Sequence, residues 1–215
     1  FGKYLLEKSL PEWRGHCVDY KSLKDLIKES AQERDEGGLP NYSPRMTSLT
    51  VQRAANPMDS AEERFFQSLD AEVDKIGQFT AGLVATLRER LQAVSRQAQI
   101  EAAGGPAGAS EDAEASSERR ESLLTEAKAV GDEFLKLEKY VNLNYMAFHK
   151  ILKKHDKLLP DTPCRQFYIS HLHNQPWVQG TYSDLLVTLS AVHSQLRGDG
   201  GRDRATARSA SGAWP

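Results

Sequence analysis

The chain has 215 residues, of which 39% are hydrophobic and 27% are charged. This length suits one or two domains, and the modest hydrophobic share is typical of elongated, well-solvated helices rather than a bulky core. The formal net charge of −2 excludes a global basic field of the kind that attracts nucleic acid, so an anion site would have to be a local cluster.

Two cysteines, Cys17 and Cys164, stand far apart in the sequence and form no pairing or metal-binding spacing. Such cysteine usage favours a reducing compartment. No apolar run approaches the roughly 20 residues that a membrane-spanning helix needs. We therefore expect a cytoplasmic domain without a metal or cofactor.

The first predicted elements are two helices. Residues 1–8 predict a short amphipathic helix, which ends before Pro11, and a second helix follows from Cys17 to Ala31. The second helix carries three lysines within an arc of about 60° at about 100° per residue. These are Lys21, Lys24 and Lys28. Residues 33–57 lack periodicity and predict a long flexible connection.

Two long helices dominate the rest of the chain. Apolar residues recur every three or four positions over 59–101 and again over 119–158, which predicts two long helices packed antiparallel. The acidic, low-complexity segment 103–118 between them predicts a disordered loop. Two shorter helices are expected over 162–173 and 182–197, and residues 198–215 predict a linker or disordered tail. The fold class is therefore all-α, with the domain covering 1–197.

The segment NYMAFHKILKKHDK, from Asn144 to Lys157, is the most informative stretch. Its lysines lie between about 140° and 240° on a helical wheel with Phe148 at zero, opposite the apolar stripe. They are Lys150, Lys153, Lys154 and Lys157. Four like charges on one face repel one another, and an anion would relieve that repulsion. The alternative is an ordinary solvated helix face.

The second helix offers a partner for this lysine group. Tyr20 and Lys24 are four residues apart and are therefore neighbours on the helix surface. A phenolic hydroxyl beside an ammonium group suits phosphate oxygens. If the two helices lie side by side, enough lysines converge to neutralise a ligand with several phosphates.

Two segments together resemble the SPX domain family. FGKYLLEKSLPEWRGHCVDYKSLKDLIK resembles the opening of that domain, and NYMAFHKILKKHDK resembles its lysine-rich helix. The resemblance implies an N-terminal helical hairpin packed on a core of long helices. It also implies binding of inositol polyphosphates and pyrophosphates as signals of cellular phosphate.

The resemblance also implies which residues hold the ligand. A tyrosine and a lysine of the hairpin join a lysine of the long helix in the family, and these map to Tyr20, Lys24 and Lys153. Further lysines border or support the pocket, and they map to Lys150, Lys154, Lys157, Lys3 and Lys28. Relatives of this kind regulate a fused transporter or polymerase, or a partner protein. The segment QFYISHLHNQPWVQGTYSDLLVTLSAVHSQLRG most resembles the end of the domain in the transporter-chaperone and transporter types. Such a parent protein would place the domain on the cytosolic face of a vacuole or acidocalcisome membrane.

Three other functions compete with this interpretation. The six histidines form no HExxH motif and accompany no nucleophile elbow or carboxylate dyad, so catalysis is not expected. Paired long helices could also serve as a scaffold for a protein or a nucleic acid, although the acidic residues 111–118 disfavour a nucleic-acid groove nearby. Finally, the same lysines could bind phosphoinositide headgroups at a membrane.

Overall fold

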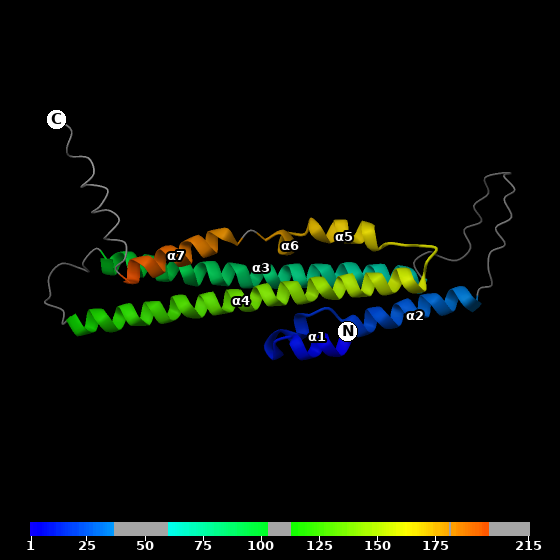
Figure 1. Cartoon of the computed structure of the whole chain (residues 1–215), viewed down its shortest axis with the longest axis horizontal. Helices are drawn as coiled ribbons and strands as arrows, with labels where there is room; N and C mark the ends of the chain where they lie inside the picture. The colour runs from blue at the N-terminus through cyan, green and yellow to red at the C-terminus, as the bar shows by residue number, and fades with distance from the viewer. Residues whose placement is uncertain (37–59, 103–112, 181, 198–215) are drawn as a thin grey trace, which may run out of the picture. The chain divides into compact units, whose positions relative to one another are not determined.

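The computed structural model describes residues 1–36, 60–102, 113–180 and 182–197. Every regular element in these ranges is a helix (Figure 1), which confirms the all-α prediction. In chain order they are α1 (Gly2–Lys8), the 3₁₀ helix η1 (Pro11–His16), α2 (Tyr20–Glu36), α3 (Ala61–Ala102), α4 (Ala113–Leu158), α5 (Arg165–His173), α6 (Pro176–Gln179) and α7 (Ser183–Arg197). The chain divides into two compact units, Phe1–Thr80 with Lys139–Gln179 and Ala81–Glu138 with Gly180–Pro215. Within the described ranges, no helix combines the length and hydropathy needed to cross a membrane.

Two of the expected loop boundaries need correction. Residues 33–36 belong to α2 and residues 113–118 to α4, where we expected the loops 33–57 and 103–118. The extra turn of α2 is held by tertiary contacts, since Glu33 accepts a hydrogen bond from the Ala61 amide at 3.0 Å and Arg34 pairs with Glu62. Alanine and glutamate, which favour helix, open α4. The other expected loop residues, 37–57 and 103–112, and the expected tail 198–215 lie outside the described residues.

The first unit combines the hairpin, the beginning of α3, the end of α4, α5 and α6. Here α3 and α4 run antiparallel, because Phe65 lies beside His155 and Phe79 lies beside Tyr140. The fully buried side chains include Phe65, Leu69, Ile76, Phe148, Ile151, Leu152 and Leu172. Full burial of each such side chain stabilises the fold by about 1.5–3 kcal/mol relative to exposure.

The second unit pairs the other halves of α3 and α4 with α7. Here too α3 and α4 run antiparallel, since Glu101 pairs with Arg119 and Arg90 pairs with Glu126 and Glu133. Leu87, Leu91, Val94, Ala127, Val130 and Val192 fill its core. A methyl group of Leu189 on α7 comes within 3.2 Å of where a Cβ on Gly131 would stand, so the glycine permits close packing.

The end of α4 is buried on a second face that the sequence pattern did not predict. Besides the expected stripe through Phe148 and Leu152, the residues Tyr140, Asn144, Ala147 and Ile151 are buried. On the wheel with Phe148 at zero these four lie between about 260° and 320°. The hairpin packs against this arc, since His16 and Val18 contact Tyr140 and Asn144.

Candidate functional site

The chain segment that leads into α2 is fastened to the long helices by side chains. The Tyr140 hydroxyl donates to the His16 carbonyl at 2.7 Å, and the ammonium group of Lys75 donates to the Cys17 carbonyl at 2.9 Å. The buried amide oxygen of Asn144 accepts from the Val18 amide at 2.9 Å. An unpaired backbone group buried here would cost about 1–3 kcal/mol, so these bonds fix where α2 begins.

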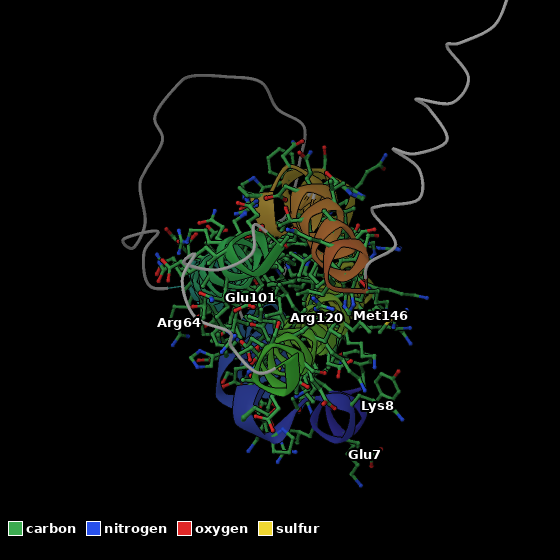
Figure 2. The ribbon with its side chains drawn as sticks, turned by 90° about the vertical axis from the view of Figure 1, so that its left-hand side faces the viewer. Glu7, Lys8, Arg64, Glu101, Arg120 and Met146 are labelled. Atoms are coloured by element: carbon green, nitrogen blue, oxygen red, sulfur yellow. The ribbon has the colours of Figure 1, made fainter. Side chains whose placement is uncertain are left out.

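Aromatic packing holds the rest of the hairpin. Trp13 of η1 lies edge-on to Phe79 and to Tyr140, with ring centroids 5.8 Å apart in both pairs. The Phe1 ring lies 5.4 Å from the Tyr20 ring, which joins the first turn of α1 to the first turn of α2. Figure 2 shows the side chain of Glu7 directed away from the other helices, so α1 keeps one polar face outward.

A pocket of about 520 Å³ opens where α1, the start of α2 and the end of α4 converge. We call it the hairpin pocket. Its lining residues are Phe1, Gly2, Lys3, Leu5, Leu6, Val18, Asp19, Tyr20, Lys21, Lys24 and Lys154. Four lysines thus face one aspartate, so the pocket has a positive charge in a chain whose overall charge is negative.

The lysines of the hairpin pocket have no carboxylate partner among the described residues. No carboxylate oxygen in those ranges lies within 4.0 Å of the ammonium groups of Lys3, Lys21, Lys24 or Lys154. Lys28, by contrast, pairs with Asp25 at 3.2 Å and does not line the pocket. The pocket therefore presents positive charge that a ligand could neutralise.

Asp19 has a structural task that occupies its carboxylate. One oxygen accepts from the Ser22 amide at 3.0 Å and the other accepts from the Ser22 hydroxyl at 2.7 Å. These bonds cap the N-terminus of α2 and hold the pKa of Asp19 below its ordinary value. The first turn of α2, which is the positive end of the helix dipole, lies at the pocket, because Tyr20 and Lys21 are among its lining residues.

Tyr20 stands half-buried at the edge of the pocket. Burial raises the pKa of its phenol, so the hydroxyl stays a proton donor at neutral pH. Among the described residues its hydroxyl has no hydrogen-bond partner, and its ring packs against the Phe1 ring. The hydroxyl is therefore available for an oxygen of a ligand.

The structure brings together only some of the site residues that the sequence predicted. Lys3, Tyr20, Lys24 and Lys154 line the hairpin pocket. Lys150, Lys153 and Lys157 are exposed on α4 outside the lining. The reason is rotation about α4, because the hairpin covers the arc from about 260° to 320° and Lys154, at about 240°, is the nearest of the four. Lys153, at about 140°, lies farthest from that arc.

Sequence reasoning missed other residues at the site. Asp19 was not expected to line it, Lys21 was expected only as one of the converging lysines of α2 and not as a ligand residue, and Asn144 was not expected to hold the hairpin. Asn144 did give a signal, because it is a polar side chain beside the apolar stripe of a long helix. Its burial with both ends of the amide bonded, to Val18 and to the Tyr140 carbonyl, explains why it occurs there.

Comparison with known proteins identifies a family and several relatives of the chain. The family model described as "SPX domain" matches residues 1–56. Subunit 2 of the vacuolar transporter chaperone complex of Saccharomyces cerevisiae is 30% identical over 198 residues, which cover 92% of this chain and 21% of that protein. Human solute carrier family 53 member 1 is 28% identical and is matched over 97% of this chain and 31% of its own length. The chain thus spans about a fifth to a third of these relatives.

A solved structure covers nearly the same extent. It is the SPX domain of Chaetomium thermophilum glycerophosphodiester phosphodiesterase 1 in complex with inositol hexakisphosphate. The two chains are 25% identical with a TM-score of 0.66, and the similarity covers 91% of this chain and 98% of the other. The likeness therefore extends well beyond residues 1–56.

Proposed function

The chain belongs to the SPX domain family, and on that premise we propose that it binds inositol polyphosphates or pyrophosphates in the hairpin pocket. In this proposal the chain is a regulatory sensor of phosphate status. It binds its ligand without transforming it, and nucleic acid is not a direct partner.

One observation carries the proposal: four lysines without carboxylate partners in the described chain converge with Tyr20 on one pocket. Hydrogen bonds between ammonium and phosphate groups are charge-assisted and roughly twice as strong as neutral ones. A single phosphate would leave several of these charges unmatched, whereas a ring bearing many phosphates would reach them all. The pocket volume of about 520 Å³ lies within the range of small-molecule sites.

The geometry suggests a division of tasks among the predicted residues. Tyr20, Lys24 and Lys154 would contact phosphate groups directly, and Lys3 would close the pocket from α1. The remaining lysines would strengthen the positive field around the entrance without sealing the pocket. These are Lys28, Lys150, Lys153 and Lys157, whereas Lys21 itself lines the pocket.

The regulated activity would lie in a fused domain or a partner protein. The relatives are a vacuolar transporter chaperone subunit and a solute carrier, which makes a transporter the fitting kind of partner, while the polymerase rests on the family resemblance. We place the domain on the cytoplasmic side of a membrane, with the face of a vacuole or acidocalcisome as one such site. Ligand binding would join the hairpin to α4 and so stiffen one against the other.

Calorimetric titration tests the proposal with three ligands: inositol hexakisphosphate, an inositol pyrophosphate and inorganic phosphate. We expect saturable binding of the first two, weak binding of the third, and affinity that falls as salt concentration rises. The Lys24→Ala, Lys154→Ala double variant should lose most of the affinity. Lys128→Ala, which removes an exposed lysine of α4 outside the pocket, is the matched control. Equal affinity of the double variant and the control would overturn the proposal.

A separate experiment tests the alternative that the lysines bind phosphoinositide headgroups. Vesicles that contain phosphatidylinositol bisphosphate are added in a sedimentation assay, with and without free inositol hexakisphosphate. Displacement from the vesicles by the soluble ligand would favour the pocket as a soluble-ligand sensor. Vesicle binding that persists under saturating soluble ligand would favour a headgroup site elsewhere on the chain.

A further inference from the structure

The junction between α4 and α5 brings three potential metal ligands together. His155 and Asp156 lie in the last turn of α4, and Cys164 is the residue that precedes α5. The Nδ1 atom of His155 lies 3.3 Å from the Cys164 sulfur and 3.4 Å from Oδ1 of Asp156. The ligand atoms of all three residues lie within 4.8 Å of one another.

We propose that His155, Asp156 and Cys164 bind a divalent transition metal ion, with Zn²⁺ as the fitting ion. This goes beyond the proposed binding of inositol phosphates and does not depend on it. Zinc accepts nitrogen, sulfur and oxygen ligands at about 2.0–2.3 Å in tetrahedral geometry, which separates the ligand atoms from one another by about 3.3–3.6 Å. The two distances from Nδ1 of His155 already match that separation.

A carboxylate behind the histidine supports the assignment. On the other side of the ring, Nε2 of His155 is buried without a hydrogen-bond partner in the described chain, and the nearest carboxylate oxygen, from Glu62, lies 3.6 Å away. A proton on Nε2 facing Glu62 leaves the lone pair of Nδ1 directed at Cys164 and Asp156. Histidines that ligate zinc commonly have such a carboxylate behind them, which fixes the tautomer.

The cluster is held in place before any ion arrives. The His155 ring is fully buried and stacks on Phe65, with centroids 5.0 Å apart and planes inclined by 19°. Asp156 accepts from the Cys164 amide at 2.9 Å and also from the Arg165 amide, so it fixes the cysteine at the start of α5. Cys164 and Asp156 are partly exposed, which gives an ion a route to the cluster.

Three protein ligands leave the fourth tetrahedral position to water. Glu62 is not the fourth ligand, because it lies on the Nε2 side and is engaged by Arg34 and by the Thr162 hydroxyl at 2.8 Å. When the ion binds, the thiol loses its proton to solvent and the sulfur becomes a thiolate ligand. The ion would then clamp the start of α5 to the end of α4.

Metal titration of the full chain tests the proposal. The chain is freed of metal, and Zn²⁺ binding is followed by calorimetry. Co²⁺ serves as a second probe, because a thiolate ligand gives a charge-transfer band in the near ultraviolet. We expect one ion per chain and that band. Cys164→Ser should abolish the band and weaken Zn²⁺ binding at least about tenfold, whereas Cys17→Ser, which changes the other cysteine, should alter neither.

Two further variants separate ligation from folding. Asp156→Asn keeps an oxygen that can accept the backbone amides of α5 but lowers metal affinity, and Glu62→Gln should weaken binding about tenfold through the histidine. Zn²⁺ should also slow alkylation of Cys164 by iodoacetamide, measured by peptide mass mapping, with Cys17 as the internal reference. Absence of saturable binding of one ion per chain, or unchanged Zn²⁺ affinity in Cys164→Ser, would overturn the proposal.

Discussion

Adjacent lysines of α4 give the sharpest test of where an inositol phosphate binds. Lys154 lines the hairpin pocket and is half-buried, whereas its neighbour Lys153 is exposed and does not line it. We expect Lys154→Ala to lower the affinity for inositol hexakisphosphate much more than Lys153→Ala. Both variants remove the same charge from the same helix, so the difference between them reports position alone.

The magnitude follows from the helix geometry. Loss of one hydrogen bond to a charged group costs about 1.5–3 kcal/mol, which corresponds to a loss of about 10-fold to 150-fold in affinity for Lys154→Ala. Lys153 is turned by about 100° around α4, which places its ammonium about 8 Å or more from that of Lys154. That is about one Debye length at physiological salt, so we expect a loss of about threefold or less.

The assay is calorimetric titration at physiological salt and again at low salt. Thermal unfolding of both variants checks that α4 is intact, and Lys128→Ala again serves as the control. The effect of Lys153→Ala should grow at low salt, because it acts through the long-range field, while Lys154→Ala should remain the more damaging at both concentrations. A larger loss for Lys153→Ala than for Lys154→Ala would refute the placement of the ligand in the hairpin pocket.

Three further predictions concern the hairpin and its attachment. Tyr20→Phe should lower affinity for inositol hexakisphosphate about twofold to tenfold in calorimetry, since it removes one hydroxyl donor and keeps the ring that packs on Phe1. Asn144→Ala should lower the free energy of unfolding in urea by about 1–3 kcal/mol, because the buried amide of Val18 loses its acceptor; an unchanged midpoint would contradict this. The depressed pKa of Asp19 means that its carboxylate stabilises the fold above the ordinary pKa and that this stabilisation is lost as pH falls. Urea unfolding between about pH 5 and pH 2 should therefore show a steeper loss for the natural chain than for Asp19→Ala.

The helices, and the pairing of Tyr20 with Lys24 on one helix face, could be predicted because their signals are local. The three-four spacing of apolar residues predicted both long helices, and the spacing of Tyr20 and Lys24 predicted that they are neighbours. Of the lysine group predicted on one side of α4, the structure brings Lys154 to the pocket lining. Lys150, Lys153, Lys154 and Lys157 could not be ranked, however, because a wheel built on one apolar stripe contains no information about the hairpin.

The hairpin's position depends on long-range contacts that single segments do not show. Asn144 and Tyr140 contact a stretch more than 120 positions earlier in the chain, and no local pattern predicts those hydrogen bonds. The same holds for the junction of α4 and α5. There His155 is fully buried beside the apolar stripe of α4, and no metal-binding spacing in the sequence includes Cys164.

The register along α4 connects these observations. The same helix fastens the hairpin through Tyr140 and Asn144, directs Lys154 into the pocket, and then presents His155 and Asp156 to α5. Each step of one residue turns a side chain by about 100°, so the number of residues between Asn144 and Lys154 decides which lysine faces the hairpin. The buried amide of Asn144 orients α4 about its axis beneath the hairpin. That orientation, more than the number of lysines in the segment, explains why Lys154 lines the pocket.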